Sequence, residues 1–272
     1  MLNAAGGWTA YRAAATDAGT VNMAVRVNLP ASAATAGRVS LYTALALLFF
    51  SVVTRAIAVE RPPVGNLWEY TVALSLGFVL FTAVFETAFK ERSVSAVLLP
   101  GAVIMMSIAL AFFPSRVAPL VPALQANRIL GLHVTTMVLA YSALSVSFGG
   151  AVLWLMQDGG SGKRFARLPD TETLGEIAYW SVLVGFPLLT LGIALGAYWA
   201  SSAWGRYWGW DPKETSALLT WFVYAGYLHA RGLRGWEGKR SAGLLIVAYG
   251  AVLFTYFAVN FLISGLHSYA GV

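Results

Sequence analysis

Long apolar stretches separated by short polar segments dominate this chain. Seven of them approach the roughly 20 residues that a helix needs to cross a bilayer: residues 39–58, 67–89, 94–113, 129–156, 175–199, 212–230 and 241–263. Because a backbone in lipid must satisfy its own hydrogen bonds, each stretch is predicted to be a helix. The pattern therefore predicts an all-α, polytopic membrane bundle of about seven transmembrane helices.

The composition agrees with this pattern and divides the chain in two. Of its 272 residues, 58% are apolar and only 11% are charged, which excludes a soluble globular protein. Residues 1–33 are rich in Ala, Thr and Asn and lack the apolar run of a signal peptide, so they are expected to be a disordered or loosely attached head. Met23 is an alternative start within that head. The membrane bundle is expected to comprise residues 34–272.

The basic residues predict an orientation. With a cytoplasmic N-terminus, 12 of the 18 Lys and Arg residues fall in inner segments and six in outer ones, which favours N-in, C-out. The formal net charge of +6 then reflects topology. The basic loops are expected to contact anionic membrane lipid, and no nucleic acid partner is expected.

An aromatic run marks the outer loop between the fifth and sixth stretches, at residues 200–214. It places four rings within seven residues: Trp204, Tyr207, Trp208 and Trp210. Two interpretations fit such a run. It is either an interfacial aromatic belt, as in many membrane proteins, or a platform on which a flat ligand stacks.

The aromatic run ends in residues that are typical of a helix start. Asp211 is the expected N-cap, Pro212 takes the first helical position, and Glu214 stands three residues after the cap. The loop is therefore expected to be joined rigidly to the sixth helix.

The chain has only three histidines, and two of them flank the aromatic loop. His133 lies at the outer end of the fourth stretch and His267 just beyond the outer end of the seventh. A single His at a helix end is ordinarily a hydrogen-bonded interfacial residue. Two beside an aromatic platform favour axial ligation of a flat metal macrocycle, for which haem is the obvious candidate.

The third histidine, His229, is predicted to lie elsewhere. It follows Glu214 by fifteen residues on one helix, which is about 22 Å, so it cannot share an iron with the outer pair. It is either a functional residue within the membrane or a structural imidazole bonded to Tyr224, Tyr227 or a carbonyl. As a haem ligand it would need a partner from another protein. The chain has no cysteine, so any thiol must come from a substrate.

These motifs together resemble the tryptophan-rich WWD family of haem-handling membrane proteins, and the Pro-Lys-Glu-Thr ending resembles its CcsA (ResC) branch. The matching segments cover most of the chain after residue 60: residues 61–70 (RPPVGNLWEY), 130–134 (LGLHV), 204–215 (WGRYWGWDPKET), 218–221 (LLTW), 227–231 (YLHAR) and 264–270 (SGLHSYA). Ser216, where the family often has another tryptophan, and Arg128, where an aromatic is expected, depart from the pattern.

The resemblance implies specific roles for these residues. His133 and His267 are implied to ligate haem b at an outer site, residues 204–211 to cradle it, and His229 to receive it within the membrane. The implied partners are a CcsB (ResB) membrane subunit, which supplies the other membrane histidine, an apocytochrome c and a thiol-reducing thioredoxin-like protein. The implied location is a bacterial plasma membrane, or alternatively a thylakoid.

The implied activity is that of one component of a cytochrome c synthase (haem lyase). Haem is presented to the Cys-x-x-Cys-His site of apocytochrome c, and no catalytic acid or base is identified. Arg206 or Lys213 is expected either to pair with haem propionates or to contact lipid headgroups. Two alternatives stay open: a haem exporter or chaperone without a role in attachment, similar to CcmC, and a structural subunit whose loop docks a partner.

Overall fold

The computed structural model describes residues 31–117, 120, 124–125, 128–157, 165, 168–261, 263 and 265–267. In these ranges the chain forms seven helices and no strand, which confirms the predicted all-α class. The helices are α2 (Ala31–Val59), α3 (Leu67–Phe89), α4 (Ser95–Phe112), α5 (Arg128–Gln157), α6 (Thr171–Trp204), α7 (Pro212–Arg234) and α8 (Gly238–Phe261). Of the expected head, residues 1–30 lie outside the described residues.

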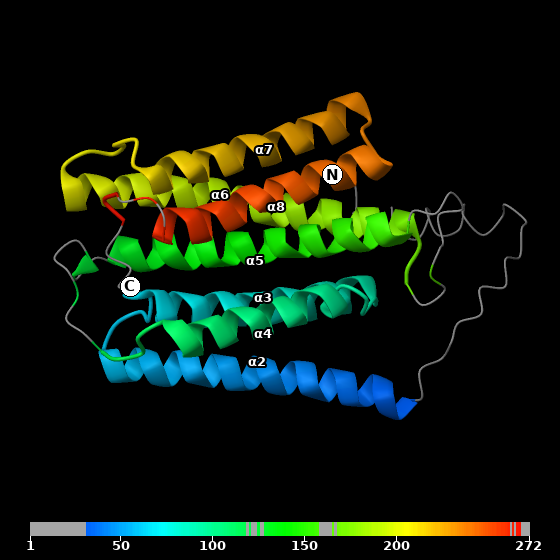
Figure 1. The fold of residues 1–272 in the computed structure, drawn as a ribbon, viewed down its shortest axis with the longest axis horizontal. Coiled ribbons are helices and arrows are strands. Elements are labelled where there is room, and N and C mark those ends of the chain that lie inside the picture. Colours follow the sequence, from blue (N-terminus) through cyan, green and yellow to red (C-terminus); the bar gives the residue numbers. More distant parts are fainter. Residues whose placement is uncertain are drawn as a thin grey trace, which may run out of the picture.

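Six of these helices are long and apolar enough to cross a membrane, and α7 is the exception. It has 23 residues, which is sufficient length, but its sequence mixes polar and apolar positions. It nevertheless runs alongside α6 and α8 within the bundle (Figure 1). The protein is thus a multi-pass helical membrane protein in which α7 is the most polar of the helices in the bundle.

Helix α5 occupies the middle of the bundle and packs against α3, α4, α6 and α8. Its closest neighbour is α6, where small residues permit a close approach of the two backbones. A Cβ at Gly192 would lie 2.5 Å from the sulfur of Met137, and one at Gly196 would lie 2.6 Å from Cε1 of His133. The glycines of α6 therefore make room for side chains of α5.

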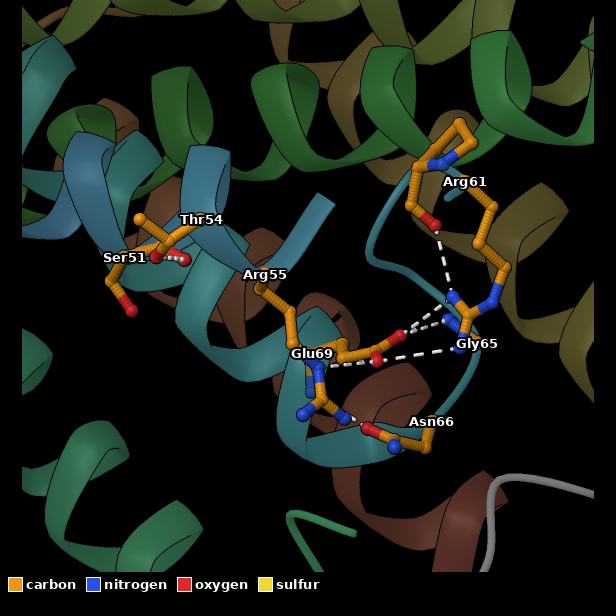
Figure 2. Close-up of polar contacts among 8 residues, drawn as sticks. Ser51, Thr54, Arg55, Arg61, Gly65, Asn66 and Glu69 are labelled. Atoms are coloured by element: carbon orange, nitrogen blue, oxygen red, sulfur yellow. Dashed lines mark hydrogen bonds and ion pairs between the residues drawn. The ribbon is translucent and has the colours of Figure 1, made fainter. Parts of the chain in front are cut away.

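Helix α2 lies at the edge of the bundle against α3, and a buried carboxylate joins the two helices (Figure 2). Glu69 is 1% exposed. It accepts hydrogen bonds from Nε of Arg55 on α2 at 2.9 Å, from Nη1 of Arg61 at 2.9 Å and from the backbone N–H of Gly65 at 2.7 Å. Asn66 caps α3 by accepting the N–H of Glu69 at 2.8 Å. This cluster fixes the segment between α2 and α3.

The bundle brings several distant segments to one end. The α6–α7 loop, the start of α5, the segment before α3 and the turn after α8 all lie at the left end in Figure 1. Consecutive helices alternate in direction, so the segments that the charge pattern assigned to one side of the membrane share one end of the bundle. We refer to this end, which holds residues 204–211 and 265–267, as the loop end.

Candidate functional site

A cavity opens at the loop end between α3, α5, α6, α7, α8 and the turn after α8. Its empty space is about 1200 Å³, including the part that is open to the outside. Its lining is mainly apolar and aromatic, with a few convergent polar groups, as in typical ligand sites. The polar and aromatic lining residues are Asn66, Tyr70, His133, Tyr141, Trp199, Trp204, Trp208, Lys213, Glu214, Thr255, Tyr256 and His267.

His133 and His267, which are 134 positions apart in the sequence, both line this cavity. His133 comes from α5, less than two turns from its start. Its Nδ1 lies 2.7 Å from the carbonyl oxygen of Gly192. A carbonyl can only accept, so Nδ1–H is the donor, and the lone pair of the neutral ring is on Nε2. Gly196 lies directly against the ring, so the imidazole is held in one orientation.

A carboxylate orients His267 in the same way. Nδ1 of His267 lies 2.6 Å from Oδ2 of Asp211, and Oδ1 of Asp211 accepts the backbone N–H of Leu266. Burial alone would raise the pKa of Asp211, but the interaction with His267 and the hydrogen bonds from the backbone N–H groups of Lys213 and Leu266 outweigh it and hold this pKa below its ordinary value. The carboxylate is therefore ionised and accepts from Nδ1–H, which again places the lone pair of the neutral ring on Nε2.

Asp211 also begins α7, as the sequence predicted. Its Oδ2 accepts the backbone N–H of Lys213 at 3.0 Å, and with Glu214 it completes a capping box with Pro212 in the first turn. One carboxylate thus starts a helix and orients a histidine that lies 56 residues away. The sequence predicted the cap but not the contact with His267.

The aromatic run divides into inward and outward rings. Trp204 and Trp208 line the cavity, and the ring of Trp204 meets His267 edge to face with centroids 4.9 Å apart. Tyr207 and Trp210 are 63% and 69% exposed and do not line it. Only two of the four rings therefore belong to the cavity, and Trp210 instead supports Trp208 at 5.9 Å.

The backbone of this loop is strained and is held by Glu214. Trp210 adopts a left-handed conformation, with φ of 57°, which costs a non-glycine residue about 1–3 kcal/mol. On either side of it, the N–H groups of Gly209 and Asp211 donate to Oε2 of Glu214, at 2.8 and 3.2 Å. The capping carboxylate therefore also sets the shape of the loop.

Trp199 is a cavity residue that the sequence analysis missed. It is 1% exposed, and its ring lies near both histidines, at 6.5 Å from His133 and 6.1 Å from His267. It belongs to the apolar stretch of α6, so its sequence context is that of an ordinary core residue. Only the pairing of α6 with α5, which a single sequence does not encode locally, reveals its position.

His229 does not reach this cavity. Its side chain is exposed on the surface of α7, fifteen residues beyond the cavity residue Glu214, or about 22 Å along the helix. Of the two cations considered for propionates, Lys213 lines the cavity and Arg206 lies outside its lining. The structure therefore brings together His133, His267, Trp204, Trp208 and Lys213.

Helices long and apolar enough to cross a membrane, with an imidazole- and indole-lined cavity at one end of the bundle, define a multi-pass membrane protein with a candidate ligand site. The family model described as "Cytochrome C assembly protein" matches residues 64–267, which include the whole site. The chain belongs to this family, and within it to the CcsA proteins.

Three relatives named "Cytochrome c biogenesis protein CcsA" support this placement. The protein of Guillardia theta is 38% identical, over 84% of this chain and 83% of its own length. That of Gloeobacter violaceus is 35% identical, over 84% of each chain. That of Synechococcus elongatus is 36% identical, over 76% of this chain and 78% of its own length. The recognition of the CcsA branch from its motifs is thus confirmed.

Proposed function

We propose that this protein binds haem b at the loop-end cavity during c-type cytochrome biogenesis, with His133 and His267 as axial ligands. One observation carries this proposal. Two imidazoles from distant parts of the chain line the same cavity, and each engages Nδ1 so that Nε2 carries the lone pair. Histidines that ligate metals ordinarily donate the other ring N–H to a carbonyl or a carboxylate, and both partners occur here.

The rest of the lining suits the macrocycle. Indole faces at Trp204 and Trp208 offer stacking surface for the porphyrin. Lys213, in the first turn of α7, offers a cationic partner for a propionate. We place this site on the external face of a bacterial plasma membrane, or of a thylakoid, as the N-in, C-out charge pattern predicts.

His229 supports a second, membrane-embedded step. An imidazole exposed on a helix at this depth is costly in lipid and is expected to face a partner. We propose that haem is first held between His229 and a histidine of a CcsB (ResB) subunit and then moves to the loop end. The two sites can therefore be tested by separate variants.

The outer site would present haem to the Cys-x-x-Cys-His segment of apocytochrome c. Each thiol S–H adds across a vinyl C=C: the sulfur bonds to one carbon and the hydrogen goes to the other, with no net oxidation. The chain has no cysteine, so both thiols come from the apocytochrome, kept reduced by a thioredoxin-like protein. The contribution of this chain would be positioning.

Co-expression with a CcsB subunit and an apocytochrome c, in a host without other assembly systems, tests the proposal. Covalent cytochrome c is expected, and it should be lost in His133→Ala and His267→Ala. With His229→Ala, haem added to the purified protein should still reach the outer site, although delivery in cells fails. External haem without covalent product would instead assign an exporter, and wild-type levels of cytochrome c in both outer-site variants would refute the site.

A further inference from the structure

Trp199 carries a donor that no residue of the described chain satisfies. Its Nε1 is buried and lacks a hydrogen-bond partner among the described residues. A buried N–H without a hydrogen-bond acceptor costs free energy, so such groups ordinarily donate to a water or a ligand. By contrast Trp221, also in the bundle, donates its Nε1–H to Thr190 at 2.8 Å.

The surroundings of Trp199 place this donor at the proposed haem site. Its ring is nearly parallel to that of His133, with 4° between the planes, and it packs edge to face on Trp204 at 4.8 Å. It lies against His267 as well, at 6.1 Å. The remaining residues of its hydrophobic cluster have aliphatic side chains, which offer no acceptor: Leu120, Leu124, Ile129, Leu130, Val134 and Ala203.

The ligand proposed for this cavity supplies what the donor lacks. Haem carries two carboxylates on one edge, and a carboxylate is the stronger acceptor for a buried N–H because its charge strengthens the bond. Trp199 is one of the residues that line the cavity that haem would fill.

We propose that Trp199 is a ligand-positioning residue of this site, which fixes the haem through a hydrogen bond from its indole N–H to a propionate carboxylate. The inference rests on the proposed outer haem site and deepens it. It assigns the rotation of the macrocycle about the axis through its iron, because the propionate edge is held beside Trp199 and the vinyl edge is turned away from it. This hydrogen bond would make the site specific for porphyrins that carry carboxylates.

Equilibrium binding of two porphyrins to the purified full chain tests this role. Haem and its dimethyl ester share size and iron but differ in carboxylate charge. Trp199→Phe keeps an aromatic ring and removes the donor, and Trp221→Phe is the matched control outside the cavity. Affinity is read from the absorbance of the six-coordinate complex.

We expect Trp199→Phe to weaken haem binding roughly tenfold. The affinity of Trp199→Phe for the dimethyl ester should fall by less than about threefold, since the ester oxygens carry no charge. Trp221→Phe should leave both affinities unchanged. If Trp199→Phe lowered the affinities for haem and for its ester equally, Trp199 would contribute only packing, and the inference would be overturned. An unchanged affinity for haem would overturn it as well. A wild-type chain that forms no six-coordinate complex would instead refute the outer site itself.

Discussion

Asp211→Asn is the most informative single change in this protein, because it preserves shape and removes one charge. The carboxylate accepts from Leu266 N–H on Oδ1 and from Lys213 N–H and His267 Nδ1–H on Oδ2, and in the capping box it also accepts the backbone N–H of Glu214. An asparagine amide has one acceptor oxygen and one NH₂ group. In either amide orientation, at least one former donor therefore faces NH₂ instead of an oxygen.

The magnitude follows from these contacts. A hydrogen bond to a charged group contributes about 1.5–3 kcal/mol, and removing the group that orients a metal ligand costs about 10–100-fold in metal affinity. We therefore expect Asp211→Asn to weaken haem binding at the outer site by about 10–100-fold. The carboxylate also makes the His267 imidazole more basic and therefore a better electron donor to iron. In Asp211→Asn this effect is lost, so the reduction potential of bound haem should rise.

Titration of haem into the purified chain, followed by spectroelectrochemistry, measures both quantities. Asp170→Asn is the matched control, since Asp170 caps α6 through the N–H of Thr173 at 2.8 Å and contacts no histidine in the described chain. The control should change neither affinity nor potential. Unchanged haem affinity and potential in Asp211→Asn would refute the view that this carboxylate orients a ligand.

The lowered pKa of Asp211 also sets a pH dependence. A carboxyl whose pKa is lower in the folded state contributes stability above its ordinary pKa, and this contribution is lost as pH falls through the folded value. The melting temperature of the wild type should therefore exceed that of Asp211→Asn at neutral pH. The difference should disappear only in strongly acidic solution, which thermal unfolding across pH can check. A difference that vanished near neutrality would contradict this assignment.

Two further changes test the packing that supports the cavity. Gly196→Ala would place a Cβ 2.6 Å from Cε1 of His133, so the ring must shift, and the haem affinity measured by titration should fall about tenfold. Gly101→Ala is the control: a Cβ at this position meets open space, so the haem affinity should not change. Glu69→Gln leaves two arginines without a carboxylate and should lower the stability of the detergent-solubilised chain by about 3 kcal/mol in chemical unfolding. Glu176→Gln breaks an ion pair whose carboxylate side chain is 44% exposed, against 0% for Glu69, so it should cost only about 1 kcal/mol. Equal losses of stability in the two glutamate variants would contradict this dependence on burial.

The sequence predicted the helices well because their apolar lengths are set by the bilayer itself. Each described helix contains or nearly matches its predicted stretch, and the Asp211–Glu214 capping box is a local signal that appears as expected. The polarity of α7 shows the limit of this reasoning. Its apolar positions are too few for a lipid-facing span, yet neighbouring helices shield part of its surface.

The cavity itself was only partly predictable. The histidines stood out because His133 and His267 flank an aromatic run, but the sequence does not say which of its rings line the cavity or that Trp210 adopts a left-handed conformation. Trp199 gave no signal, since a tryptophan in an apolar helix is ordinarily core. Its role depends on which helix α6 packs against, and that is decided by tertiary contacts.

Axial ligation of haem by His133 and His267 together at the loop end is the feature on which the proposed function depends most. Near-infrared magnetic circular dichroism of the purified chain with added haem measures axial ligation directly. We predict a bis-imidazole signature that is lost in His133→Ala and in His267→Ala but retained in His229→Ala. A bis-imidazole spectrum that survived unchanged in the double variant His133→Ala, His267→Ala would show that these two histidines are not the axial ligands.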